Sequence, residues 1–138
     1  MADTLPSGAE RIKQWFAVSP FGRHVGLELT RVDLDRADVV MPFQASLPTL
    51  GNVVHGGAIS TLIDTAATVA AWSGAEVPEG TRGATIALTV TFMAAGRGDL
   101  TATARVVRRG SSVCFCDVDV TDPGGGRVAK GLVTYKIG

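Results

Sequence analysis

The fold is decided by residues 57–73, which read GAISTLIDTAATVAAWS. On a helix drawn from this stretch, apolar side chains cover most of the circumference, and five of the residues are alanines. A helix of this kind is buried, and its small side chains let neighbouring elements approach closely. Polar residues form one narrow stripe, with Ser60, Asp64 and Thr68 at intervals of four residues. We therefore expect one long buried helix with a single polar line along it.

Segments with the pattern of strands lie on both sides of this helix in the sequence. Six stretches are interpreted as strands: 25–30, 37–41, 85–92, 100–106, 113–121 and 128–137. The last four are joined by glycine-bearing connections of hairpin length. The sequence therefore predicts the α+β class, with an antiparallel sheet of about five or six strands curled around the long central helix.

A single domain accounts for the whole chain, residues 1–138. A chain of this length buries roughly two thirds of its unfolded surface, so it can form a hydrophobic core without disulfides. The first 20 residues are interpreted as an N-terminal extension. Within it, Ile12, Trp15 and Phe16 fall on one face of a short amphipathic helix expected over 9–17.

The composition excludes several kinds of partner. Hydrophobic residues make up 46% of the chain, and 13 basic side chains balance 13 acidic ones. A net charge of zero offers no overall attraction for nucleic acid or an anionic membrane. No run approaches the ~18 apolar residues of a membrane span. The first residues, MADTLP, lack the basic and apolar regions of a secretory signal. We therefore expect a cytoplasmic protein whose partners include neither nucleic acid nor a membrane.

Cysteine and histidine are too scattered to suggest a metal site. Cys114 and Cys116 would share one face of a strand, roughly 6.6 Å apart, with near-parallel Cβ vectors that suit a disulfide poorly. We expect both to be reduced and packed. Together with His24 and His55 they lack zinc-type spacing, so no metal ligand is predicted.

The start of the long helix carries residues that suit carbonyl chemistry. In His55-Gly56-Gly57, the glycines let another molecule approach the backbone closely. The first N–H groups of a helix have no internal partners and lie at the positive end of its dipole, so they can polarise a carbonyl as an oxyanion hole does. Asp64 follows Gly57 by two turns on nearly the same face. The alternative is a glycine-assisted helix start and a solvent-facing Asp64, but a carboxylate among apolar residues is costly unless it is paired or functional.

The run HGGAISTLIDTA, residues 55–66, resembles the signature of the hotdog-fold acyl-CoA thioesterases of the PaaI type. Residues 85–93 resemble the strand that follows the helix in this family, residues 98–110 the next strand and turn, and residues 128–137 the closing strand. The resemblance covers the chain from about Phe21 onward. An HGG motif separated by six residues from an Asp on a long helix, followed by four strands, is a fairly specific combination.

The resemblance implies an acyl-CoA thioesterase that releases a free acid, which could be aromatic, and coenzyme A. It implies a sheet wrapped around the helix, homodimers with joined sheets that often pair into homotetramers, and active sites shared between subunits. No metal or redox cofactor is implied. By motif position, the Gly57 N–H polarises the thioester carbonyl and Asp64 of the partner acts as nucleophile or general base. His55 shapes the loop, and Thr85 positions the water or the carboxylate.

The substrate-binding residues are assigned through the same resemblance. Family members often have Asn six residues before the motif histidine and Gly three before it, where this chain has Thr49 and Asn52. We expect Asn52 to supply an amide through a shifted loop, or the carbonyl to have one donor fewer. Gly56 and Phe92 are expected to contact the substrate.

A basic turn could bind the phosphates of coenzyme A. Arg108 and Arg109 stand beside Gly110 and Ser111, and guanidinium groups and turn N–H groups suit oxyanions. The alternative is a solvated hairpin turn.

Two other functions stay open. A hotdog-fold enoyl-CoA hydratase or dehydratase would need a histidine paired with an acidic residue, and His24 is the only histidine besides His55. A non-catalytic acyl-CoA-binding protein would not need Asp64. Fold resemblance alone does not decide the reaction.

Overall fold

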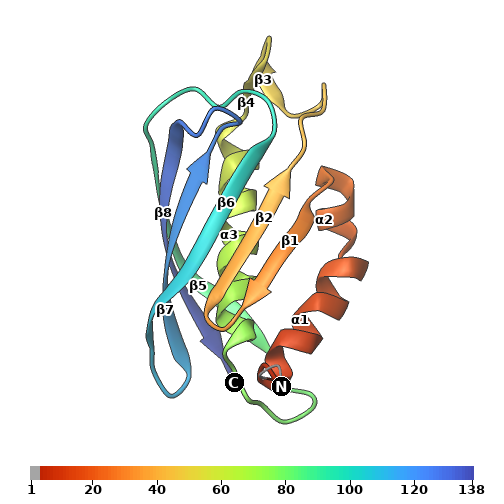
Figure 1. Cartoon of the computed structure of the whole chain (residues 1–138), viewed down its shortest axis with the longest axis vertical. Coiled ribbons are helices and arrows are strands. Elements are labelled where there is room, and N and C mark those ends of the chain that lie inside the picture. The colour runs from red at the N-terminus through yellow and green to blue at the C-terminus, as the bar shows by residue number, and fades with distance from the viewer. Residues whose placement is uncertain (1–3) are drawn as a thin grey trace.

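The computed structural model describes residues 4–138, so the first three residues of the expected N-terminal extension lie outside the described residues. Over this range the helices are α1 (Ser7–Val18), α2 (Pro20–Val25) and α3 (Gly56–Ser73). The strands are β1 (Glu28–Asp33), β2 (Arg36–Met41), β3 (Pro48–Leu50), β4 (Val53–Val54), β5 (Gly83–Phe92), β6 (Leu100–Arg109), β7 (Val113–Thr121) and β8 (Arg127–Ile137). The predicted α+β class is confirmed (Figure 1).

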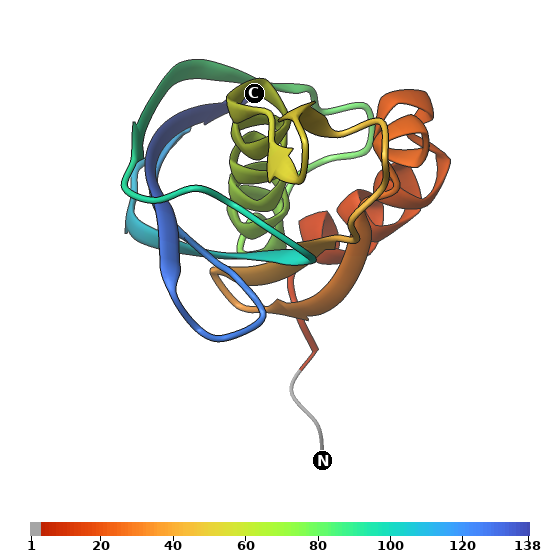
Figure 2. The same cartoon turned by 90° about the horizontal axis from the view of Figure 1, so that it is seen from above.

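One antiparallel sheet of six strands curls around α3. Its strand order is β1-β2-β6-β7-β8-β5, so β1 and β5 form its two edges. Seen from above, the sheet passes around α3 on three sides, while α1 and α2 lie beside the helix near the β1 edge (Figure 2). This arrangement confirms the helix enclosed by a curled sheet that the sequence predicts. Among the described residues, no helix is long and apolar enough to cross a membrane.

The apolar circumference of α3 packs against the sheet. Ten of its residues are buried, among them Leu62, Ile63 and Trp72, which have no exposed surface. Gly131 of β8 faces Ile63 so closely that a Cβ at this glycine would lie 2.4 Å from the Ile63 side chain. At the end of the helix, the Trp72 ring N–H donates to the Tyr135 hydroxyl at 2.9 Å. Small residues in helix and sheet therefore let the two layers approach closely.

The β5 edge leaves apolar side chains exposed. Ile86 is 57% exposed, Leu88 is 40% exposed and Phe92 is 52% exposed, and Met93, just after the strand, is 48% exposed. Only one side of β5 is hydrogen-bonded within the sheet, where it pairs with β8. An unpaired, apolar edge strand is a surface on which another chain can add a strand.

One strand predicted before α3 is misplaced, and one short hairpin was not predicted. The strand expected over 25–30 begins at Glu28, because residues 20–25 form α2. Ser19 caps this helix by accepting from the Gly22 N–H, Pro20 is its first residue, and Gly26 ends it in the left-handed conformation at φ 84°. Serine, proline and glycine at these positions are a start-and-stop signal that the sequence carries. The short β3–β4 hairpin was also not predicted.

The cysteines are as expected. Cys114 and Cys116 are free and buried on one face of β7. Burial raises the pKa of both thiols, that of Cys116 to about 12, so neither is a reactive thiolate near neutral pH. Across residues 4–138, the His, Cys, Asp and Glu side chains form no group of three or more that could hold a metal ion.

Candidate active site

The start of α3 has one backbone N–H that finds no partner in the described part of the chain. His55 is the N-cap residue, and its Nδ1 accepts from the Gly57 N–H at 2.8 Å. The His55 carbonyl accepts from the N–H groups of Ala58 and Ile59. Within residues 4–138 the Gly56 N–H has no acceptor. The prediction that Gly57 polarises a carbonyl is therefore corrected, because the His55 ring already holds that N–H, and Gly56 carries the free donor.

His55 thus has a defined role at this site. We expect His55→Ala to lower the free energy of unfolding by about 1 kcal/mol, because the Gly57 N–H loses its cap. His55→Asn should retain most of the stability, since asparagine is a strong N-cap. Urea denaturation of the two variants measures the difference. Equal loss in both would contradict the capping role.

Other predicted residues gather around Gly56. The Phe92 ring lies over this glycine, where an added Cβ would be 3.2 Å from the ring. Asn52 is exposed in the turn between β3 and β4, and its Oδ1 accepts from Arg97 at 3.2 Å. The structure therefore groups His55, Gly56 and Phe92 at one end of α3.

Asp64 lies in the middle of α3 and is held by β5. The Thr85 hydroxyl donates to Asp64 Oδ1 at 2.6 Å, which is the contact expected for a residue that positions the carboxylate. Among the described residues no hydrogen bond reaches Asp64 Oδ2. Asp64 is half-buried and its negative charge adds to burial in raising the pKa of Tyr135. One carboxylate oxygen is thus fixed, and the other is available to a reactant.

Gly56 and Asp64 cannot act on one carbonyl within one chain. They are eight residues apart on α3, which is about 12 Å along the helix axis. The carbon and oxygen of a carbonyl are only about 1.2 Å apart. A site that uses both groups therefore needs a second α3.

The predicted phosphate turn lies at the opposite end of α3. Arg109 bonds Asp35 at 2.7 Å and the Ala71 carbonyl at 2.8 Å, and its side chain is only 26% exposed. The Gly110 N–H donates to the Val113 carbonyl. The expectation that Arg109 and the Gly110 N–H face a ligand is therefore corrected, because both groups are already bonded within the chain. Arg108 and Ser111 are exposed.

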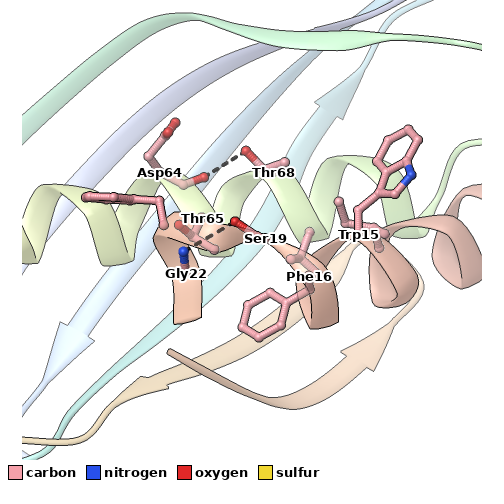
Figure 3. A pocket seen from close by; sticks show the side chains of 10 residues that line it. Trp15, Phe16, Ser19, Gly22, Asp64, Thr65 and Thr68 are labelled. Carbon is pink, nitrogen blue, oxygen red and sulfur yellow. Dashed lines mark hydrogen bonds between the residues drawn. The ribbon is translucent and has the colours of Figure 1, made fainter. Parts of the chain in front are cut away.

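A cavity beside Asp64 was not predicted. It has a volume of about 280 Å³, and it lies between α3 and the N-terminal helices. Figure 3 shows Asp64, Thr65 and Thr68 along α3, with Trp15, Phe16, Ser19 and Gly22 on the facing segment. Phe21 also lines it. One feature of the sequence indicates an aromatic wall here, because three of the eight aromatic residues fall between positions 15 and 21.

Comparisons with known proteins bear on the family and the fold. The model of a family described as the thioesterase superfamily matches residues 51–129, which include Gly56, Asp64 and Thr85. A protein of Halobacterium salinarum that carries an esterase name is 46% identical over 70 residues, which are 51% of this chain and 46% of that protein. The chain therefore spans about half the length of that relative.

Solved structures share the fold. The PaaI protein of Escherichia coli, from the phenylacetic acid degradation operon, has a TM-score of 0.83 at 23% identity, covering 96% of this chain and 95% of that one. A hypothetical thioesterase protein of Streptococcus pneumoniae, solved with coenzyme A, has a TM-score of 0.72 at 24% identity, covering 82% of this chain and 86% of that one. The predicted resemblance is confirmed for family and fold.

Proposed function

The chain belongs to the thioesterase superfamily, and we propose that it hydrolyses acyl- or aroyl-CoA thioesters to the free acid and coenzyme A. The observation that carries this proposal is the Asp64–Thr85 pair, which fixes one carboxylate oxygen and leaves the other free at a cavity. Such a carboxylate suits a nucleophile or a general base.

The proposed reaction needs only water and groups of the protein. The thioester oxygen accepts from the Gly56 N–H, which stabilises the negative charge that develops on it. Asp64 of the partner subunit either takes a proton from water as the water oxygen bonds to the carbonyl carbon, or attacks that carbon itself. The carbon–sulfur bond then breaks. In the first route Asp64 returns the proton to the sulfur, which leaves as the thiol of coenzyme A, and in the second route the sulfur leaves as a thiolate that takes a proton from water. In the second route, water cleaves the resulting anhydride.

The shared site implies a homodimer, which we propose as the minimal active unit. Two copies joined along β5 would extend the antiparallel sheet and cover the exposed side chains of Ile86, Leu88 and Phe92. Thr85 lies on the same strand, so this contact also brings each Asp64 towards the second subunit. A pair of such dimers would form the homotetramer expected from the resemblance.

Coenzyme A is proposed as the thiol portion because the chain belongs to this superfamily and a structural relative of Streptococcus pneumoniae was solved with that molecule. Of the two arginines predicted to bind its phosphates, only Arg108 is exposed.

The two arginines should therefore respond differently to substitution. Arg108→Ala should raise KM several-fold and leave kcat nearly unchanged, because exposed phosphate contacts contribute to binding alone. Arg109→Ala should instead lower the free energy of unfolding by about 1 kcal/mol, since it removes the bonds to Asp35 and Ala71. Steady-state kinetics and urea denaturation on both variants check this. A large loss of kcat in Arg108→Ala at unchanged KM would contradict the binding role.

A panel assay tests the proposed function itself. Purified protein is incubated with acyl-, aroyl- and acyl-carrier thioesters, and the released thiol is measured. Hydrolysis of acyl- or aroyl-CoA above the acyl-carrier thioesters is the expected result. Release of no thiol from any of them, with consumption of an enoyl-CoA instead, would favour the hydratase.

The positions of the two histidines speak against the hydratase. Among the described residues, His55 caps α3 and His24 is exposed at the end of α2, which leaves no histidine paired with Asp64.

A further inference from the structure

We infer that the N-terminal helices form the pocket for the acyl group, and that Trp15 and Phe21 select a compact apolar acyl group about one ring in size. The inference rests on the proposed function, because it places the acyl group of the thioester beside Asp64. It goes beyond that function in assigning substrate selection to a segment that lies outside the residues matched by the superfamily, 51–129.

The walls of this cavity suit an apolar group. The hydroxyl of Thr65 donates to the Thr61 carbonyl at 2.8 Å, and that of Thr68 donates to the Asp64 carbonyl at 2.9 Å. Ser19 accepts from the Gly22 N–H. Each of these three hydroxyls therefore already bonds a backbone group. Trp15 and Phe16 supply aromatic surface (Figure 3), as does Phe21.

The charge of the cavity sets the orientation of the substrate. Asp64 is the only charged residue among those that line it, and no lysine or arginine is present. The phosphates of coenzyme A therefore have no partner here, whereas an uncharged acyl group can enter with its carbonyl next to Asp64. The coenzyme A portion of the substrate must therefore extend away from this cavity.

The cavity, which is partly open to solvent, has room for an acyl group of about one ring. At about 280 Å³ it is roughly twice the ~150 Å³ apolar cavity that accepts benzene, so one ring and a short spacer fit. Its α3 wall runs from Asp64 to Val69, about 7.5 Å along the helix axis.

Trp15 is fixed in place at this cavity. Its ring meets Trp72 edge-on, with ring centroids 4.9 Å apart and planes at 83°. Trp72 is itself fully buried and bonded to Tyr135. Trp15 is 43% exposed, and its contact with Trp72 holds the ring at the cavity wall, while Phe21 is 59% exposed and can be changed without opening the core.

The test compares benzoyl-CoA with acetyl-CoA in wild type, Phe21→Ala, Thr68→Phe and a matched control. Phe21→Ala removes an aromatic wall, and Thr68→Phe fills the cavity from the α3 side. Phe43→Ala is the control, because Phe43 is a partly exposed phenylalanine that does not line the cavity. We expect wild type and control to prefer benzoyl-CoA at least tenfold in kcat/KM, and both cavity variants to lose most of that preference. An unchanged preference in both cavity variants would overturn the inference.

A binding measurement separates this inference from the proposed function. The phenacyl thioether of coenzyme A cannot be hydrolysed, and Trp15 and Trp72 are the only tryptophans of the chain. Its binding should change the fluorescence of wild type but not of Trp15→Phe, and Kd should rise about tenfold in Phe21→Ala relative to Phe43→Ala. If no thioester is hydrolysed, the proposed function fails, and this difference in Kd still supports the pocket. Equal Kd values in the two variants would overturn it.

Discussion

Asp64→Asn is expected to lower kcat on the best substrate by roughly 10²–10⁴, the usual contribution of a positioned acid–base group. Asparagine keeps the volume of the side chain, and its amide oxygen can still accept from Thr85. It can neither take a proton from water nor attack a carbonyl well. The thermal midpoint should therefore stay the same or rise, and the oligomer should remain intact. Initial rates, calorimetry and sedimentation provide the three measurements.

Asp33→Asn is the matched control for this substitution. It makes the same chemical change at a half-exposed carboxylate of β1, whose one bonding partner among the described residues is Arg31, and wild-type turnover is expected. If Asp64→Asn keeps more than about a tenth of wild-type turnover, Asp64 is neither the nucleophile nor the base. The thioesterase assignment could survive that result, but the mechanism could not.

The second large effect is expected at Gly56. Gly56→Pro removes the free N–H and should lower kcat by roughly 10²–10³, the cost of losing one oxyanion donor. Proline is favoured as the first residue of a helix, and His55 at φ −60° and ψ 136° already has the conformation preferred before proline. Gly56→Ala is the control, because it adds the same Cβ beside Phe92 but keeps the N–H. A similar loss in both variants would assign the effect to crowding against Phe92.

The two inactive variants should complement each other. If Gly56 of one subunit works with Asp64 of the other, a mixed dimer of Gly56→Pro and Asp64→Asn carries one intact site. Random pairing makes half of the dimers mixed, so co-expression should restore about a quarter of wild-type activity. Activity no higher than that of either variant alone would show that the two groups do not meet across subunits.

The sequence predicted α3 and the strands after it because these elements are set by local periodicity. The short α2 was not predicted, because a six-residue helix has too few turns to show a hydrophobic period. Ser19, Pro20 and Gly26 nevertheless mark its ends. The resemblance implied that Thr85 positions the water or the carboxylate, and in the structure the Thr85 hydroxyl donates to Asp64. Pattern alone could not have paired two residues on different elements.

The roles predicted for Gly57 and Arg109 were wrong, because they depend on side-chain contacts that a sequence pattern does not show. The rotamer of the N-cap side chain decides which N–H at the start of a helix stays free. Here His55 Nδ1 accepts from the Gly57 N–H, so among the described residues the Gly56 N–H is left free. The inward direction of Arg109 depends on Asp35, 74 residues away. The cavity beside Asp64 arises from the packing of α1 against α3, which likewise depends on distant contacts.

The position of β8 in the sheet has a consequence for folding. β8 lies between β7 and β5, although β5 precedes β7 in the chain. During synthesis, α3 and β5 therefore emerge with apolar surface that stays uncovered until β8 has been made. Pairing of segments this far apart in sequence slows folding and lengthens the time in which such surface can aggregate. The yield of native protein in a cell should therefore depend on how quickly β8 inserts, and a chaperone that shields α3 meanwhile should raise it.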